Sequence, residues 1–320
     1  MKYLLSLFCC IIFLHSCAKK NINLKNSPIT KIDSISNLNE LRKFVTNADE
    51  ALKQFMCMSP HVYKSEELAS SPLKAKLDSL IPKKDYLKAD FDGNGLIDLV
   101  ITGSVNFSFS ALAILDQGDE NYKVLSLTPS NSFIQFPVYT QLITKNGKQL
   151  IEVYQKSLSL VNEDFVKSVL VYKDGNFIEY QDEPADYQIS KIEFGTAGCF
   201  GTCPVFDMTI LPSGKSKFHA KYFNFSQQRG SDEEEGQFET ELKPSDFNAI
   251  VQMMNELNIK DLESNYRVGW TDDQTIKIKV TFADGSLKFI QDYGMQGTRG
   301  LMLLYEKLLA LRFNQDWQRI

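Results

Sequence analysis

The sequence predicts an α+β protein, and three observations support that fold class. Apolar residues recur at steps of three and four over residues 37–56, as on one face of an amphipathic helix. Between Asp85 and Tyr180, short runs rich in Val, Ile, Leu, Tyr and Phe alternate with turn residues, which is typical of strands. After Ile189, further strand-like runs are followed by helix-like stretches. Strands and helices grouped in this way indicate α+β architecture with antiparallel sheets.

The first predicted domain, residues 37–182, combines an N-terminal helical part with an antiparallel β-sheet. Asn37 and Glu40 resemble a capping box at the start of the first helix, and a second helix is expected over residues 72–81. The dipeptide Asp174-Gly175 predicts a two-residue hairpin turn. Strands are expected at residues 97–105, 111–115, 149–155, 166–172 and 176–180.

The second predicted domain, residues 187–320, is a compact α+β unit with two helices packed on an antiparallel sheet. One helix is expected over Lys243–Leu262 with Ser245 as its N-cap, and the other over Thr298–Phe313. Strands are expected at Ile189–Phe194, Val205–Leu211, Lys215–Tyr222, Thr275–Phe282 and Ser286–Asp292.

Residues 1–16 have the features of a signal peptide. Lys2 provides a positive charge, and an apolar run follows from Tyr3 to Leu14. This run is shorter than the roughly 20 residues that a membrane-spanning helix needs, and it has the length of a signal-peptide core. The sequence therefore predicts export of the chain.

The apolar run ends at Leu14-His15-Ser16-Cys17, which resembles the lipobox of bacterial lipoproteins. The resemblance implies cleavage before Cys17, attachment of diacylglycerol to its sulfur and acylation of the new N-terminus, for example by palmitate. His15 departs from the family pattern, which has a small residue at that position. The alternatives are a cleaved signal peptide without lipid and an N-terminal core segment with a chance cysteine.

Residues 17–36 are polar and predict a tether between the lipid and the folded part. Ala18 follows the cysteine, and by similarity to lipoprotein sorting signals this favours the outer membrane of the cell envelope. The net charge of −5 argues against nucleic acid as a partner. The expected partners are the membrane, through the lipid anchor, and an envelope protein or glycan.

The segment D-F-D-G-N-G-L-I-D predicts a calcium site. Side-chain oxygens of Asp90, Asp92, Asn94 and Asp98 and the backbone carbonyl of Leu96 stand at alternating positions of this loop. Hard oxygen ligands at such spacing suit calcium. The alternative is a tight acidic turn without a metal.

The same loop differs from an EF-hand and resembles the loop of FG-GAP-type β-propeller repeats. Ile101 stands where an EF-hand has its bidentate Glu, and a strand signal follows instead of a helix. In FG-GAP repeats, D-x-D-G-[DN]-G-x-x-D leads into a strand. The sequence holds one copy, so a complete propeller is not expected, and the resemblance implies structural calcium.

Cys199 and Cys203 flank Gly201 at a spacing that permits a disulfide. An exported location favours the oxidised pair, which would fix a local turn. The alternatives are reduced turn cysteines, a redox-active dithiol and a metal site, although redox enzymes usually carry C-x-x-C at a helix N-terminus. Cys57 is expected to be a buried free thiol.

The stretch from Ile189 to Phe313 resembles an uncharacterised family of domains in bacterial lipoproteins. The resemblance depends on C-F-G-T-C-P at residues 199–204 and on the later residues Tyr266 and Thr271-Asp272. It implies a domain boundary and brings no known activity.

No catalytic motif is evident in the sequence. It has no nucleotide-binding glycine pattern, no H-E-x-x-H and no G-x-S-x-G, and no motif pairs two acids as general acid and base. The predicted function is a non-catalytic binding or interaction role in the cell envelope. The competing hypothesis is a periplasmic enzyme, either a dithiol oxidoreductase that uses Cys199 and Cys203 or an unrecognised hydrolase.

Overall fold

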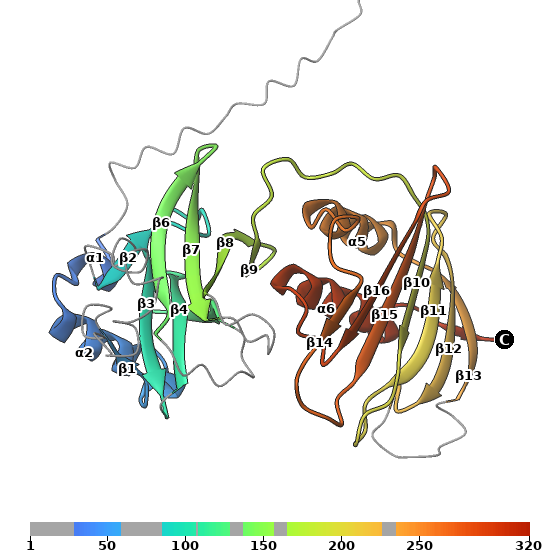
Figure 1. Ribbon diagram of the computed structural model, residues 1–320, viewed down its shortest axis with the longest axis horizontal. Coiled ribbons are helices and arrows are strands. Elements are labelled where there is room, and N and C mark those ends of the chain that lie inside the picture. Colours follow the sequence, from blue (N-terminus) through green and yellow to red (C-terminus); the bar gives the residue numbers. More distant parts are fainter. Residues whose placement is uncertain (1–28, 59–84, 107, 129–136, 157–164, 226–234) are drawn as a thin grey trace, which may run out of the picture.

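A computed structural model describes residues 29–58, 85–106, 108–128, 137–156, 165–225 and 235–320. These residues form three sheets, in which antiparallel pairing dominates, and a few helices. In Figure 1, helices α1 and α2 lie at the left, the five-stranded and four-stranded sheets overlap beside them, helices α5 and α6 follow, and the eight-stranded sheet lies at the right. None of the described helices is long and apolar enough to cross a membrane.

The helical start is shorter than the periodicity predicts. Helix α1 spans Lys31–Ser34 and helix α2 spans Leu38–Ala48. Asn37 caps α2 by accepting hydrogen bonds from the backbone N–H groups of Asn39 and Glu40, as expected for an N-cap. The Glu40 carboxylate accepts from the N–H of Ser36, so the predicted capping box is only half formed.

Helix α2 ends at Ala48 because Asp49 leaves the helical conformation and caps a new turn. Its side chain accepts from the Ala51 N–H and starts the 3₁₀ helix η2, Glu50–Leu52. Strand β1, Met56–Cys57, follows. The predicted helix at residues 72–81 lies outside the described residues.

The N-terminal region holds two sheets, where the sequence predicts one. The five-stranded sheet has the order β1-β3-β4-β5, and β2 also pairs with β3. The four-stranded sheet is a meander in the order β6-β7-β8-β9. The strands are β2 Tyr86–Ala89, β3 Asp98–Val105, β4 Ser108–Asp116, β5 Tyr122–Ser126, β6 Tyr139–Lys145, β7 Lys148–Lys156, β8 Phe165–Lys173 and β9 Asn176–Glu179.

Two sheets form because strand β3 is apolar on both faces and needs a covering layer on each. Leu99 and Ile101 belong to a core with α1 and α2. Val100 belongs to a second core that includes Ile151 of β7 and Leu170 of β8. Continuous apolar strands of this kind are buried on both sides. The hairpin at Asp174-Gly175 is confirmed, with positive φ at both residues and Lys173 paired to Asn176.

The C-terminal region is an eight-stranded sheet covered on one face by two helices. Its order is β14-β16-β15-β10-β11-β12-β13-β17, and only the β14–β16 pair is parallel. The strands are β10 Ile189–Thr196, β11 Val205–Ile210, β12 Lys215–Tyr222, β13 Gly236–Glu241, β14 Asn265–Arg267, β15 Thr275–Phe282, β16 Leu287–Tyr293 and β17 Gln318–Arg319.

Helix α5 spans Pro244–Glu256 and helix α6 spans Arg299–Asn314. The predicted N-cap at Ser245 is wrong: Lys243 is the cap residue and Pro244 opens the helix, where its fixed φ is favourable. Thr298 caps α6, and its hydroxyl accepts from the Leu301 N–H. The apolar faces of both helices pack on the sheet in one core.

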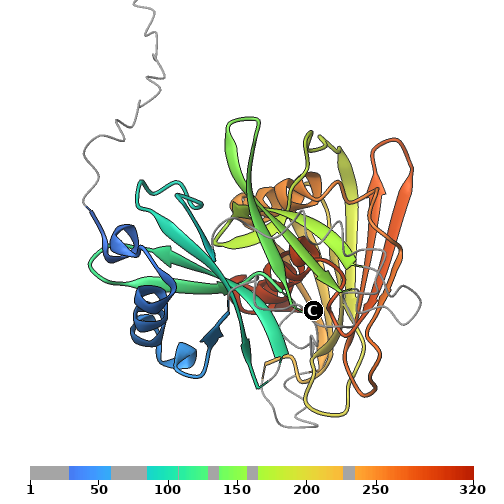
Figure 2. The same cartoon turned by 60° about the vertical axis from the view of Figure 1, so that its left-hand side comes forward.

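Helix α6 also contacts the four-stranded sheet. Ile178 of β9 belongs to the core formed by the eight-stranded sheet and its helices. Both views place α6, in red, between the four-stranded sheet and the eight-stranded sheet (Figures 1 and 2). The N-terminus of α6 therefore lies where the N-terminal and C-terminal regions meet.

Candidate functional site

The acidic loop between β2 and β3 gathers three of the five predicted metal ligands. Carboxylate oxygens of Asp90, Asp92 and Asp98 lie within 4.8 Å of one another. Gly93 and Gly95 have φ values of 78° and 89°, a conformation that glycine adopts without strain. The two glycines allow the loop to fold back and bring the carboxylates together.

The carboxylates also hold the loop closed through its backbone. Asp98 is fully buried and accepts from the N–H groups of Phe91 at 2.7 Å and Asp116 at 2.9 Å. Asp90 accepts from Gly93 and Gly95. Burial raises the pKa of Asp98 to about 7, although the backbone hydrogen bonds act in the opposite direction. A cation between these groups would offset both the burial and the mutual repulsion of the acids.

Asn94 and Leu96 lie in the same loop but are tied to each other. The Asn94 side-chain oxygen accepts from the Leu96 N–H at 2.7 Å, and its amide nitrogen donates to the Asp116 carbonyl. The donor set is all oxygen, as calcium requires, so the loop chemistry fits the predicted ion. Strand β3 follows the loop, as predicted, where an EF-hand has a helix.

Cys199 and Cys203 form a disulfide, with their Cα atoms 5.7 Å apart. Their loop joins β10 to β11, and no helix begins there. Its end is anchored at the Pro204 carbonyl, which accepts from the Thr196 hydroxyl at 2.6 Å and the Gln274 amide at 2.7 Å. The loop therefore has no helix N-terminus of the kind that lowers the thiol pKa in dithiol enzymes.

The structure also places Cys57 and an exposed histidine of the C-terminal sheet. Cys57 is a buried free cysteine, as predicted, and burial raises the pKa of its thiol to about 11. His219 lies exposed on β12, opposite Asp207 and Gln237 in the sheet register. Cys17 and the lipobox lie outside the described residues.

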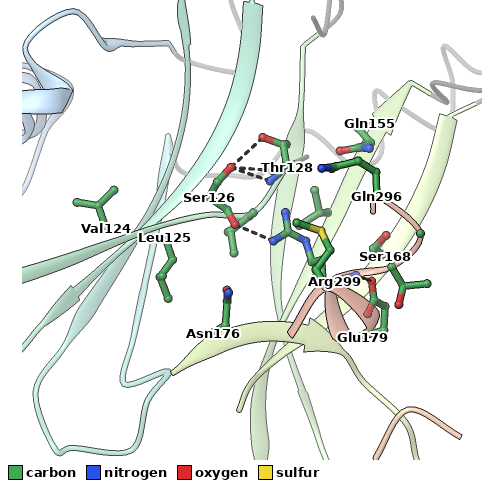
Figure 3. A pocket seen from close by; sticks show the side chains of 15 residues that line it. Val124, Leu125, Ser126, Thr128, Gln155, Ser168, Asn176, Glu179, Gln296 and Arg299 are labelled. Atoms are coloured by element: carbon green, nitrogen blue, oxygen red, sulfur yellow. Dashed lines mark hydrogen bonds between the residues drawn. The ribbon is translucent and has the colours of Figure 1, made fainter. Parts of the chain in front are cut away.

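A pocket that no sequence motif predicted lies where β5, the four-stranded sheet and the start of α6 meet (Figure 3). Its volume is about 330 Å³. The lining mixes neutral polar and apolar side chains with one acid and one base. These residues are Val124, Leu125, Ser126, Leu127, Thr128, Val153, Gln155, Ser168, Asn176, Glu179, Gln296, Gly297, Thr298, Arg299 and Met302.

Arg299 is the cation of this pocket. Its Nη1 donates to the Ser126 carbonyl at 2.8 Å. Burial lowers the pKa of Arg299, and the charge of Glu179 raises it. The Glu179 carboxylate accepts from the backbone N–H groups of Arg299 at 2.9 Å and Gly300 at 3.0 Å, so an acid of β9 caps helix α6.

A buried carboxylate holds the turn that forms one wall of the pocket. Asp292 accepts from the N–H of Gln296 at 3.2 Å, from the N–H of Gly297 at 2.8 Å and from the Tyr305 hydroxyl at 3.0 Å. Burial raises the pKa of Asp292, although these hydrogen bonds lower it.

Gly297 is required at its position in that turn. A Cβ there would lie 2.8 Å from both the Asp292 Oδ2 and the Tyr266 Cγ, closer than packed atoms allow. Tyr266, which the sequence comparison singled out, therefore backs the pocket wall. The other motif named with Tyr266 in the sequence analysis, Thr271-Asp272, lies outside the pocket. The Asp272 carbonyl accepts a hydrogen bond from the Phe200 N–H in the disulfide loop.

Sequence reasoning missed the pocket because its lining is spread over residues 124–302 and assembles only in the fold. The one local signal is Thr298, whose N-cap role marks the start of α6 beside Arg299. The sequence pattern alone does not distinguish a partly buried arginine such as Arg299 from a surface arginine.

The comparisons with known proteins agree with the C-terminal part of this description. No curated protein and no solved structure matches the chain. Residues 190–312 match the family described as Domain of unknown function (DUF6438). That stretch contains the disulfide loop, Tyr266, Asp292 and the Gln296–Arg299 side of the pocket. The C-terminal region of this chain thus carries a domain of an uncharacterised family, as its sequence predicts.

Proposed function

We propose that the protein is an exported lipoprotein, held at the cell envelope by lipid on Cys17, and that it has a non-catalytic binding role there. The lipobox-like sequence at Leu14–Cys17 supports the anchor. The Cys199–Cys203 disulfide supports export, since disulfides persist in oxidising compartments. The outer membrane is the proposed location because Ala18 follows the lipidated cysteine.

One observation carries the binding role, namely the chemical character of the pocket between the two regions. A volume of about 330 Å³ is within the range of small-molecule sites. Among the described lining residues there is no histidine and no cysteine, and Glu179, the single acid, is engaged by backbone N–H groups. The lining can therefore hold and orient a ligand, and it offers no nucleophile paired with a base.

We further propose that calcium stabilises the loop from Asp90 to Asp98. Three carboxylates converge there, and one of them is fully buried. Calcium would bridge Asp90, Asp92 and Asp98 and fix the connection between β2 and β3. This role is structural, since the loop and the Arg299 pocket share no lining residue.

Membrane fractionation of the full-length chain in a Gram-negative host tests the proposed anchor. The wild-type protein should sediment with the membranes, and Cys17→Ser should release it or leave it unprocessed. Cys10→Ser is the matched control, because Cys10 lies in the same apolar segment outside the lipobox. Membrane attachment that survives Cys17→Ser, or that is lost equally in Cys10→Ser, would contradict the anchor.

A further inference from the structure

We propose that the pocket around Arg299 binds a small organic carboxylate that also carries hydroxyl or amide groups. This inference deepens the binding role proposed above and rests on it, because it names the chemical class of the ligand. Three features of the pocket favour such a ligand: the unused donors of Arg299, the neutral polar side chains around it and the limited positive charge of the lining.

The guanidinium of Arg299 has more donors than its protein neighbours use. A guanidinium offers five N–H groups, and within the described residues one hydrogen bond engages them, from Nη1 to the Ser126 carbonyl. No salt bridge of the described chain includes Arg299. The Arg299 side chain is partly buried, and the nearby Glu179 carboxylate makes no direct ion pair with it in the described residues. The pocket therefore offers unused charged donors to an anionic group.

The N-terminus of α6 is not the anchor for that anion. Glu179 already accepts from the N–H groups of Arg299 and Gly300, and the Thr298 hydroxyl accepts from the Leu301 N–H. The first turn of the helix is therefore satisfied by the protein itself. The ligand must be recognised by side chains, with the Arg299 guanidinium as the charged group.

Three neutral polar side chains surround the guanidinium and are also available. Gln155 comes from β7, Ser168 from β8 and Gln296 from the turn before α6, and Figure 3 shows them grouped around Arg299. Their side chains make no hydrogen bond to another residue in the described part of the chain. Amide and hydroxyl groups in this position suit a ligand with hydroxyl or amide substituents.

The charge of the pocket favours a carboxylate over a phosphate. Arg299 is the single cationic residue of the described lining, and Glu179 contributes a negative charge to the same wall. A planar carboxylate matches the guanidinium fork with two parallel hydrogen bonds and one unit of charge. A phosphate dianion would meet the repulsion of Glu179 without a second cation. Val153, Leu125 and Met302 supply apolar contacts for the carbon skeleton.

Calorimetric titration of the full-length chain in detergent micelles tests the ligand class with matched probes. Glucuronate is compared with glucose, N-acetylglycine with N-acetylglycinamide, and both acids with inorganic phosphate. We expect at least one acid to bind in the millimolar range or tighter, about tenfold more strongly than its neutral partner and more strongly than phosphate.

Two pocket variants and one control connect that binding to the proposed residues. Arg299→Gln should weaken the acid at least about tenfold, because it removes a charge-assisted hydrogen bond. Gln155→Leu should weaken it less and should fold normally, since this side chain has no described hydrogen bond to lose. Arg267→Gln removes the same charge from an exposed position on β14 and should leave the affinity unchanged.

The outcomes separate this inference from the proposed anchor. Absence of binding by both acids, tighter binding of phosphate, or an affinity that Arg299→Gln and Gln155→Leu both leave unchanged would overturn the carboxylate site. Each of these results can occur while the protein remains attached to the membrane. Membrane fractionation of the same preparation measures that attachment independently. Loss of attachment with carboxylate binding retained would instead contradict the anchor alone.

Discussion

Asp292 is the residue that fixes the geometry of the pocket wall. It is almost fully buried, and its carboxylate accepts hydrogen bonds from Gln296, Gly297 and Tyr305. These contacts join strand β16, the turn before α6 and the body of α6. A buried carboxylate that accepts several hydrogen bonds holds its neighbours precisely, but its ionisation in a desolvated position is costly.

The raised pKa of Asp292 predicts a specific pH dependence in the variant Asp292→Asn. Burial raises the folded-state pKa above the ordinary value of 3.8. As pH rises through 3.8, the unfolded chain loses this proton before the folded chain does, so the wild type loses stability until the raised pKa is passed. The asparagine variant lacks this loss. Its free energy of unfolding, relative to wild type, should therefore increase between pH 3 and pH 7.

Urea denaturation of both proteins at a series of pH values measures this difference. The part of the difference in unfolding free energy that does not vary with pH reports the hydrogen bonds lost in the variant. The part that changes with pH reports the titration of Asp292. A difference that is independent of pH, or that falls as pH rises, would show that Asp292 is not held in a costly charged state.

For single residues, the sequence predicts a site well when its members lie in one short motif. It predicts a site poorly when the members are far apart in the chain. The spacing of Asp90, Asp92 and Asp98 within one short loop forces their carboxylates together, and the structure shows them within 4.8 Å. The pair Cys199 and Cys203 is likewise constrained by its short loop and is bonded. Arg299 has no such local partner: Ser126 lies 173 residues away in sequence, so only the tertiary fold reveals their contact.

The loop between β2 and β3 is the element on which the calcium proposal depends. Its carboxylates converge, and its glycines take the positive φ values that the turn needs. An ion that binds the folded loop and not the unfolded chain raises stability in proportion to the logarithm of its concentration over Kd.

Calcium should raise the melting temperature of the wild-type protein, and Asp92→Asn should reduce that shift. At concentrations about one hundred times Kd, the expected increase is on the order of 5 °C. Asp119→Asn is the matched control, because Asp119 is an exposed acid of a nearby turn outside the ligand set. Scanning fluorimetry in excess chelator and in millimolar calcium gives the comparison. Equal melting temperatures in the two conditions would favour a metal-free acidic turn.

Helices and strands with a clear hydrophobic periodicity could be predicted from the sequence. Strands that form only by pairing with a neighbouring strand could not. Strands β12 and β15 and helix α6 follow their hydrophobic patterns closely. Strands β14 and β17 are short and mostly exposed, so they carry no apolar signature and exist through pairing at the sheet edges. The division of the N-terminal strands between two sheets depends on which layers cover β3, and pattern alone does not give this.

At the scale of the whole molecule, β9 and α6 connect the N-terminal and C-terminal regions. Glu179 of β9 caps α6, Lys173 forms an ion pair with Glu256 of α5, and Lys307 of α6 pairs with Asp174. Ile178 adds an apolar contact to the C-terminal core. The Arg299 pocket lies in this junction, so the geometry of the binding site depends on the docking of the two regions.

Replacing the cap tests this coupling. Glu179→Ala should lower the free energy of unfolding by about 1 kcal/mol, because two N–H groups of α6 lose their acceptor and the helix loses a favourable charge. Glu179→Gln keeps an acceptor oxygen and should cost less. Glu183→Ala, at an exposed position in the segment between the regions, is the control. Chemical denaturation that gives the same stability for Glu179→Ala and Glu183→Ala would rule out the cap as a coupling contact.

Export with lipid attachment is the central claim of the proposed function, and the Cys199–Cys203 disulfide supports it. Intact mass spectrometry of the full-length chain, isolated from a Gram-negative envelope and treated with an alkylating reagent without reductant, tests it most directly. The expected species begins at Cys17, carries the added mass of diacylglycerol and a fatty acyl chain, and remains unalkylated at Cys199 and Cys203. A chain that retains residues 1–16, or that begins near residue 17 without added lipid mass, would contradict the anchored lipoprotein.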